Sequence, residues 1–221
     1  MKKRVKVLPR PLGRPRREDR PPGSTRAKLL ESAAEVFSEE GYAGASISSI
    51  ADRAGVTSGA LYRHFASKAD VLLHVVEQAV HGLPLSEKLA SGGRTTPRFF
   101  SQLVSAYASP AVRQLRRLAI EIHAAASRDK DAADLLTEFN RRTHEALRLR
   151  LVQCIESGAL PATLDTARSA SLLLVLVMGL AHLDTLEPGL LGDRDWTRFL
   201  DVSVERLLRV ANAASAPRGD R

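Results

Sequence analysis

The stretch SISSIADRAGVTSGALYRHF, residues 46–65, decides how this chain folds. Ser46 stands before an apolar segment, where its side chain can cap a short helix. A tight turn at 55–57 separates this helix from a second one, expected over 58–65. The apolar side chains that would then face inward are Ile47, Ile50, Ala51, Val56 and Leu61. Two short helices joined by a glycine turn describe a helix-turn-helix, here at about 45–64.

The exposed face of the second helix would be polar. It would present Thr57, Ser58, Tyr62, Arg63 and His64. Hydroxyls and backbone amides near a helix N-terminus suit phosphate oxygens, and Gly59 has no side chain to keep a duplex from the main chain. Lys68 begins the next helix, from which it can reach the DNA backbone. The same pattern also fits a plain αα-hairpin inside a helical bundle.

The flanking segments are helical in pattern as well, which predicts an all-α fold. Ser24 or Thr25 can cap a helix that stops at Gly41, and a capping box at 67–70 begins a helix that runs to about 81. Beyond a glycine-rich loop at 91–96, helices are expected over 97–108, 111–127, 130–157, 163–186 and 194–213. The chain therefore divides into an arm (1–23), a head (24–82), a helical domain (95–213) and a disordered tail (214–221).

The positive charge is concentrated in the arm. The 221 residues contain 33 Lys and Arg against 25 Asp and Glu, a net charge of +8. Residues 1–28 hold eleven of the bases and two of the acids, so this segment carries +9 and the remainder −1. A near-neutral body with a basic arm is typical of nucleic-acid binders, although basic tails also bind acidic membranes or merely keep a protein in solution.

Several classes of protein are disfavoured. The single cysteine, Cys154, excludes a disulfide framework and is expected to be a buried apolar residue, and His123, His144 and His182 are too scattered to suggest a metal. The longest apolar stretch, 171–181, is too short for a membrane span, and the N-terminus lacks the apolar run of a secretory signal. No phosphate loop or nucleophile elbow is found. We expect a cytoplasmic protein with no cofactor, no membrane partner and no enzymatic activity.

Residues 25–77 resemble the DNA-binding head of the TetR family of bacterial transcriptional regulators. The resemblance is carried, in one register, by Gly41-Tyr42, 46–51, 54–56, 59–65 and Ser67-Lys68. It implies a sequence-specific DNA-binding regulator associated with the nucleoid, most simply a repressor. A non-specific or architectural DNA-binding protein that acts through the basic arm is the alternative.

The resemblance also implies which residues contact DNA. They are Ser46, Thr57, Ser58, Gly59, Tyr62, Arg63, His64 and Lys68. Residues 57–59 would enter the major groove, while Tyr62, His64 and Lys68 would contact the phosphate backbone. Arg63 is the candidate for a base contact, to guanine O6 and N7, and a phosphate contact or a solvated arginine is the alternative.

The arm contains a second candidate DNA contact. Gly13-Arg14-Pro15-Arg16 resembles the core of an AT-hook, in which Arg14 and Arg16 would lie in a narrow minor groove. Leu12 stands where such cores usually have arginine, and a purely electrostatic tail explains the arm equally well. In both cases the arm should steepen the salt dependence of DNA binding.

The resemblance makes the helical domain a regulatory and dimerisation domain. The two last helices carry broad apolar faces, which include Leu172, Val175, Leu176 and Leu183 on one and Trp196, Phe199, Leu200 and Leu207 on the other. Such faces suit a four-helix interface in a homodimer, whose two-fold symmetry matches a palindromic operator. The alternative is that they form the core of one protomer.

A ligand cavity for an unknown small-molecule effector is expected in this domain. Its candidate lining residues are Phe99, Phe100, Leu103, Tyr107, Leu118, Ile122, His123, Phe139, Met178 and His182. Each of them can equally be plain core. Aromatic residues make up only 5% of the chain, which argues against a cage for planar cationic dyes and leaves aliphatic or acyl ligands open.

Overall fold

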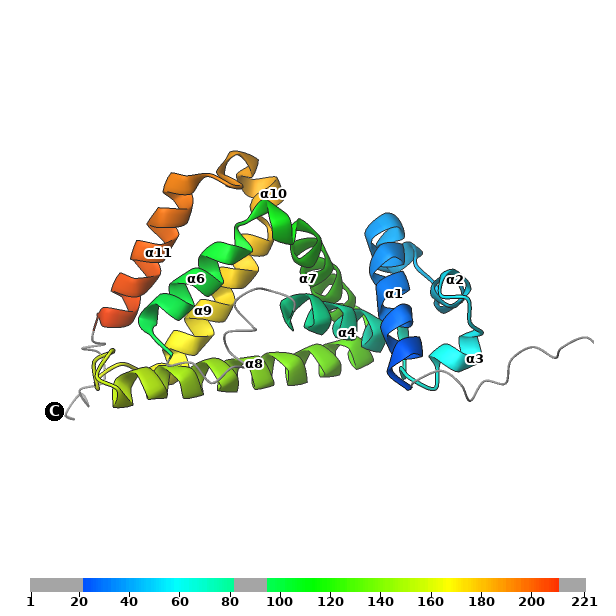
Figure 1. Ribbon diagram of the computed structural model, residues 1–221, viewed down its shortest axis with the longest axis horizontal. Helices are drawn as coiled ribbons and strands as arrows, with labels where there is room; N and C mark the ends of the chain where they lie inside the picture. The colour runs from blue at the N-terminus through cyan, green and yellow to red at the C-terminus, as the bar shows by residue number, and fades with distance from the viewer. Residues whose placement is uncertain (1–21, 82–94, 211–221) are drawn as a thin grey trace, which may run out of the picture.

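A computed structural model describes residues 22–81 and 95–210, whose regular secondary structure is all helical, with no strand among them (Figure 1). The head consists of α1 (Pro22–Gly44), α2 (Ile47–Arg53), α3 (Ser58–Leu61) and α4 (Lys68–His81). The regulatory domain consists of α6 (Pro97–Tyr107), η1 (Pro110–Val112), α7 (Arg113–Ala126), α8 (Lys130–Glu156), α9 (Thr166–Ala181), α10 (Leu183–Leu186), η2 (Pro188–Leu190) and α11 (Arg194–Arg209). The all-α prediction is confirmed, whereas the arm with Arg14 and Arg16, loop residues 91–94 and the tail lie outside the described residues.

Helix α1 contributes one buried face to the core of the head. Its buried residues Leu29, Ala33, Val36 and Phe37 recur at the three- and four-residue spacing of one helical face. The helix begins at Pro22, a residue favoured in a first turn, so the prediction that Ser24 or Thr25 caps it is wrong. Helical geometry breaks at the expected place, because Gly41 has a φ of 68° that side chains other than glycine's rarely adopt.

The regulatory domain differs from prediction in its second half. The helix expected over 163–186 begins at Thr166, where the Asp165 side chain accepts a hydrogen bond from the Arg168 amide. It is divided at His182, whose φ and ψ of −88° and 2° separate α9 from the short α10. Within the part of the chain that the structure describes, no helix is long and apolar enough to cross a membrane.

The two domains meet along a broad seam. Helices α1 and α4 of the head pack against α7, and α4 also packs against α8. In Figure 1 the helix-turn-helix projects from the right of the molecule, on the far side of α1 from the regulatory domain. Helix α8 runs along the base of that domain, where α6 packs against both α9 and α11.

A buried arginine ties three elements of the regulatory domain together. The side chain of Arg116, on α7, is fully buried, and its Nη1 donates to the carbonyls of Tyr107 and Ser109 at 2.7 Å each. Its Nε donates to Asp184 Oδ2, on α10, at 2.8 Å, and Arg113 Nε donates to the other oxygen of that carboxylate at 2.7 Å. Arg116 therefore holds the end of α6 and the short α10 against α7, and it holds the pKa of Asp184 below its usual value.

Candidate nucleic-acid interface

The helix-turn-helix is built from local signals in the sequence. Ser46 Oγ accepts from the Ser49 amide at 3.0 Å, and the Ser46 amide donates to Ser49 Oγ at 3.1 Å, so the expected cap is confirmed as a reciprocal capping box. Gly55 makes the turn with a φ of 68°. The side chains of Ile50 and Leu61 are fully buried and hold α2 and α3 together.

The recognition helix is shorter than the sequence pattern predicts. Helix α3 ends at Leu61, Tyr62 is its C-cap, and residues 62–64 form a turn rather than the last part of a helix over 58–65. The chain turns here because Phe65 is buried, with the Arg26 guanidinium 5.1 Å and the His74 ring 5.4 Å from its ring centre. The prediction that Leu61 faces inward is confirmed, and Phe65 belongs to the core of the head as well.

The predicted contacts gather on one exposed surface. Thr57, Gly59, Tyr62, Arg63 and His64 are exposed, and Ser58 is half-buried. Tyr62 is 56% exposed although it is a large aromatic residue, and no side chain or backbone group of the described residues pairs with its hydroxyl, with the Arg63 guanidinium or with the His64 ring nitrogens. A phenol, a guanidinium and an imidazole are thus available to an outside partner, and such groups contact phosphate oxygens in protein–DNA complexes.

Besides Ser46, which caps α2, two of the predicted contacts also have structural roles. Thr57 Oγ1 accepts from the Ala60 amide at 3.2 Å and so caps α3. Lys68 Nζ donates to the carbonyls of Tyr42 and Ala45 at 2.7 and 2.8 Å and lies 4.3 Å from the centre of the Tyr42 ring. Lys68 therefore joins the end of α1 to α4, a role without a local signal, since the two residues are 26 positions apart.

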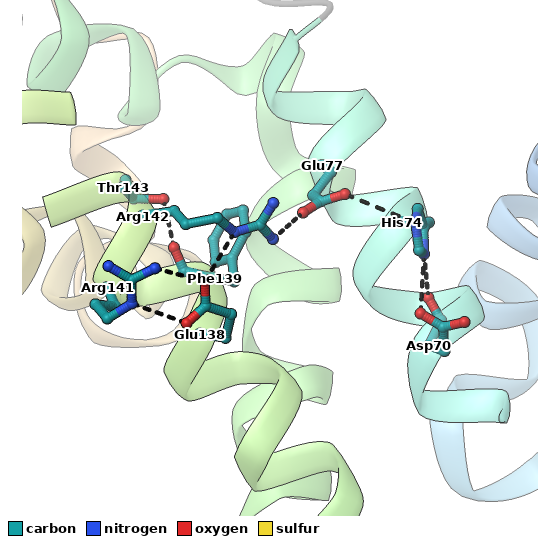
Figure 2. Close-up of polar contacts among 8 residues, drawn as sticks. All are labelled: Asp70, His74, Glu77, Glu138, Phe139, Arg141, Arg142 and Thr143. Atoms are coloured by element: carbon teal, nitrogen blue, oxygen red, sulfur yellow. Dashed lines mark hydrogen bonds and ion pairs between the residues drawn. The ribbon is translucent and has the colours of Figure 1, made fainter. Parts of the chain in front are cut away.

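Polar contacts link α4 to the regulatory domain (Figure 2). Glu77, on α4, forms an ion pair with Arg142, on α8, at 2.8 Å. One turn earlier, His74 Nδ1 lies 3.1 Å from the Asp70 carboxylate, and the His74 ring meets the edge of Phe65. Helix α4 therefore has an ion pair with α8 through Glu77 and a ring contact with the end of the helix-turn-helix through His74.

The candidate effector residues differ in their burial. Phe100, Tyr107 and Ile122 are buried, Phe99, Leu103, Phe139 and Met178 are half-buried, and His123 and His182 are exposed. Burial raises the pKa of Tyr107 to about 12, and partial burial together with the nearby His182 lowers the pKa of His123. A cavity is found elsewhere, between α1 and α7, and of the ten candidates only Leu118 lines it.

The apolar faces of the last helices divide into two sets. Leu173, Leu183, Leu200, Val204 and Leu208 are buried within the protomer. Leu172 and Val175 on α9, and Phe199, Val202 and Leu207 on α11, are exposed, with Val175 at 66% and Phe199 at 60%. Large exposed apolar side chains that form a contiguous patch mark an interaction surface.

Comparison with known proteins identifies the chain. Residues 29–75 match the model of the tetR family of bacterial regulatory proteins. Residues 99–209 match the model of the C-terminal domain of BetI-type transcriptional repressors. The transcriptional regulator SrpR of Pseudomonas putida is 30% identical over 164 residues, which cover 72% of this chain and 74% of SrpR. The transcriptional activator FasR of Mycolicibacterium smegmatis is 45% identical over 75 residues, 34% of each chain. The structure of GusR from Salmonella enterica shares the fold, with a TM-score of 0.66 at 24% identity over 86% of this chain and 97% of GusR.

A helix-turn-helix head followed by a helical domain defines a DNA-binding transcriptional regulator. The chain belongs to the TetR family of bacterial transcriptional regulators. The resemblance inferred from the head is thereby confirmed, and an architectural role through the arm alone is not favoured.

Proposed function

We propose that the protein is a dimeric repressor that a small-molecule effector releases from a palindromic operator in the bacterial cytoplasm. The observation that carries DNA recognition is the surface of α3 and the following turn, where Tyr62, Arg63 and His64 are exposed and have no hydrogen-bond or ion-pair partner among the described residues. In this proposal residues 57–59 enter the major groove, Tyr62 and His64 bind phosphates, and Arg63 binds a guanine. Ser46 and Lys68 add contacts at the groove edges in addition to their bonds within the head.

Changing Tyr62 to alanine is expected to weaken operator binding by about 1–3 kcal/mol, because alanine has neither the hydroxyl that binds phosphate nor the aromatic ring. Thermal stability should stay the same, since the side chain is 56% exposed. Titration of a labelled operator duplex in a gel-shift assay measures the effect. Tyr62→Phe is the matched variant, and it should show the effect of the hydroxyl alone. Native affinity in the alanine variant would remove Tyr62 from the interface.

The dimer is proposed to form through the exposed faces of α9 and α11. Val175 and Phe199 are exposed in the protomer, and the second copy would cover both. Four helices, two from each protomer, then bury these residues around a two-fold axis. The same axis relates two recognition helices, which is what a palindromic site requires.

Val175→Glu is expected to raise the dissociation constant of the dimer at least about a hundredfold, because the interface would have to bury an unpaired carboxylate. Sedimentation velocity at micromolar concentration should show monomers. Leu149→Glu is the matched control, since Leu149 is 49% exposed on α8, away from the proposed interface, and should leave the dimer intact. A dimeric Val175→Glu protein would exclude this face of α9.

Effector control is proposed to act through α4. In the DNA-bound dimer the two recognition helices lie about 34 Å apart, one turn of the duplex. An effector binds among the core residues of α6 to α9. If it binds more tightly to a conformation in which the recognition helices have another spacing, it shifts the population away from the DNA-bound state. The contacts that support this route are the Glu77–Arg142 ion pair and the contact between His74 and Phe65.

Deleting residues 1–20, which include nine Lys and Arg, is expected to reduce the slope of log affinity against log salt concentration. Removal of one phosphate contact reduces the magnitude of that slope by about 0.9. Fluorescence anisotropy with the operator over a range of salt concentrations gives the slope, and Arg14→Gln/Arg16→Gln serves as the variant that keeps the length of the arm. An unchanged slope would place the arm away from the DNA.

A further inference from the structure

A cavity of about 290 Å³ lies where the head meets the regulatory domain. Helix α1 contributes Phe37, Ser38 and Gly41 to its wall, and the facing side of α7 includes Arg117 and Glu121. One wall therefore belongs to the domain that binds DNA and the other to the domain that receives the effector. A molecule in this cavity would touch both.

Two hydrogen bonds join α1 to α7 beside the cavity. Gln114 Nε2 donates to the Ala34 carbonyl at 3.4 Å, and the Tyr42 amide donates to Glu121 Oε2 at 3.0 Å. Gln114 and Glu121 lie seven residues apart, so the two bonds are separated by about two turns of α7. Between them α1 presents the short side chain of Ser38 and no side chain at Gly41, which explains why the space is not filled.

The cavity has an apolar floor, and its wall carries two charged side chains, Arg117 and Glu121. Phe37 and Leu118 are 2% and 3% exposed and form the floor. Arg117 is exposed, and its guanidinium has no partner among the described residues, whereas Arg113 and Arg116 beside it share Asp184. Glu121 keeps its negative charge, but it accepts the Tyr42 amide through Oε2, so Arg117 is the charged side chain of the wall that has no hydrogen-bond or ion-pair partner among the described residues. A guanidinium binds a carboxylate with two parallel hydrogen bonds.

We propose that this junction cavity binds a small carboxylate with a compact apolar body, and that its occupancy fixes the angle between the head and the regulatory domain. The site is distinct from the effector cavity proposed above, with which it shares only Leu118. Because Gly41 is the point where helical geometry breaks at the end of α1, the occupant lies beside the natural bend of the head. The effect of the occupant on DNA binding rests on the proposed function, whereas the binding of the occupant in the cavity does not.

Binding is tested with the full chain and 4-(trifluoromethyl)benzoate, followed by ¹⁹F NMR line broadening. Ser38→Met should fill the cavity, and Arg117→Gln should remove the charge, and each should weaken binding about tenfold or more. The matched controls are Ala27→Met, at an exposed position of α1, and Arg198→Gln, at an exposed position of α11; both should bind as the native chain does. The cationic analogue 4-(trifluoromethyl)benzylamine should bind more weakly.

Absence of binding at millimolar probe, or native affinity in either Ser38→Met or Arg117→Gln, would overturn the proposal. The second measurement uses a duplex selected by the native chain. Saturating probe should change its dissociation constant at least threefold for the native chain and leave it unchanged for Ser38→Met. An unchanged constant for the native chain overturns the regulatory role. Failure of the native chain to select any duplex would contradict the proposed function instead, and the NMR result would still decide the site.

Discussion

The variant Asp184→Ala should lose about 3 kcal/mol of unfolding free energy, because it leaves the fully buried Arg116 guanidinium without its counter-ion. Loss of one partner of a buried pair costs about 3–5 kcal/mol. The lower end applies here, since Arg116 keeps its bonds to the Tyr107 and Ser109 carbonyls and Asp184 remains 21% exposed. Urea unfolding at a fixed protein concentration measures the loss, because a dimer's stability depends on concentration.

Three comparisons separate this effect from a general disturbance. Arg113→Gln removes a 54% exposed partner of the same carboxylate and should cost no more than about 1 kcal/mol. The double variant Arg116→Met/Asp184→Ala buries no unpaired charge and should be more stable than Asp184→Ala. The lowered pKa of Asp184 means that its contribution is present above about pH 4, the range of its ordinary value of 3.8, and is lost as the pH falls through the folded value. Equal stability of Asp184→Ala and the native chain would contradict this account.

Gly59→Leu should weaken operator binding at least about a hundredfold, close to 3 kcal/mol, without destabilising the protein. A Cβ at this position would meet only Thr57 Oγ1, at 4.0 Å, so the protein has room for a side chain. Leucine also favours a helix more than glycine does. A leucine on this exposed surface would occupy the space that the proposal assigns to the DNA.

Gly189→Leu is the control for this change. Gly189 lies in η2, and a Cβ there would meet nothing within 4 Å. This variant should keep native affinity, and Gly59→Ala should fall between it and Gly59→Leu. Anisotropy titrations and thermal melts of all three give affinity and stability together. Native affinity in Gly59→Leu would show that α3 does not enter the groove.

Local signals were sufficient for much of the fold. The cap at Ser46, the turn at Gly55 and the break at Gly41 each depend on groups within a few residues, and the structure has all three. The predicted length of α3 was wrong because the burial of Phe65 against Arg26 and His74 ends the helix. Those partners come from α1 and α4. The apolar periodicity of the sequence alone does not predict that contact.

The features that the sequence did not reveal depend on residues far apart in the chain. Glu121 binds the Tyr42 amide across 79 residues, and Arg116 binds Asp184 across 68. No spacing rule connects such pairs, so neither the junction between the domains nor its cavity was predictable. For the predicted DNA-contact surface, the sequence indicated that Tyr62, Arg63 and His64 share an exposed face, and all three are exposed; which of them reads a base depends on the operator.

Selection of bound sequences from a random duplex pool, with the purified full chain at near-physiological salt, tests the central claim most directly. The account predicts enrichment of a palindrome whose half-sites are about one helical turn apart, and loss of that enrichment in Gly59→Leu. Salt-sensitive bulk binding without any enriched sequence would leave only the electrostatics of the arm and would contradict sequence-specific recognition by α3.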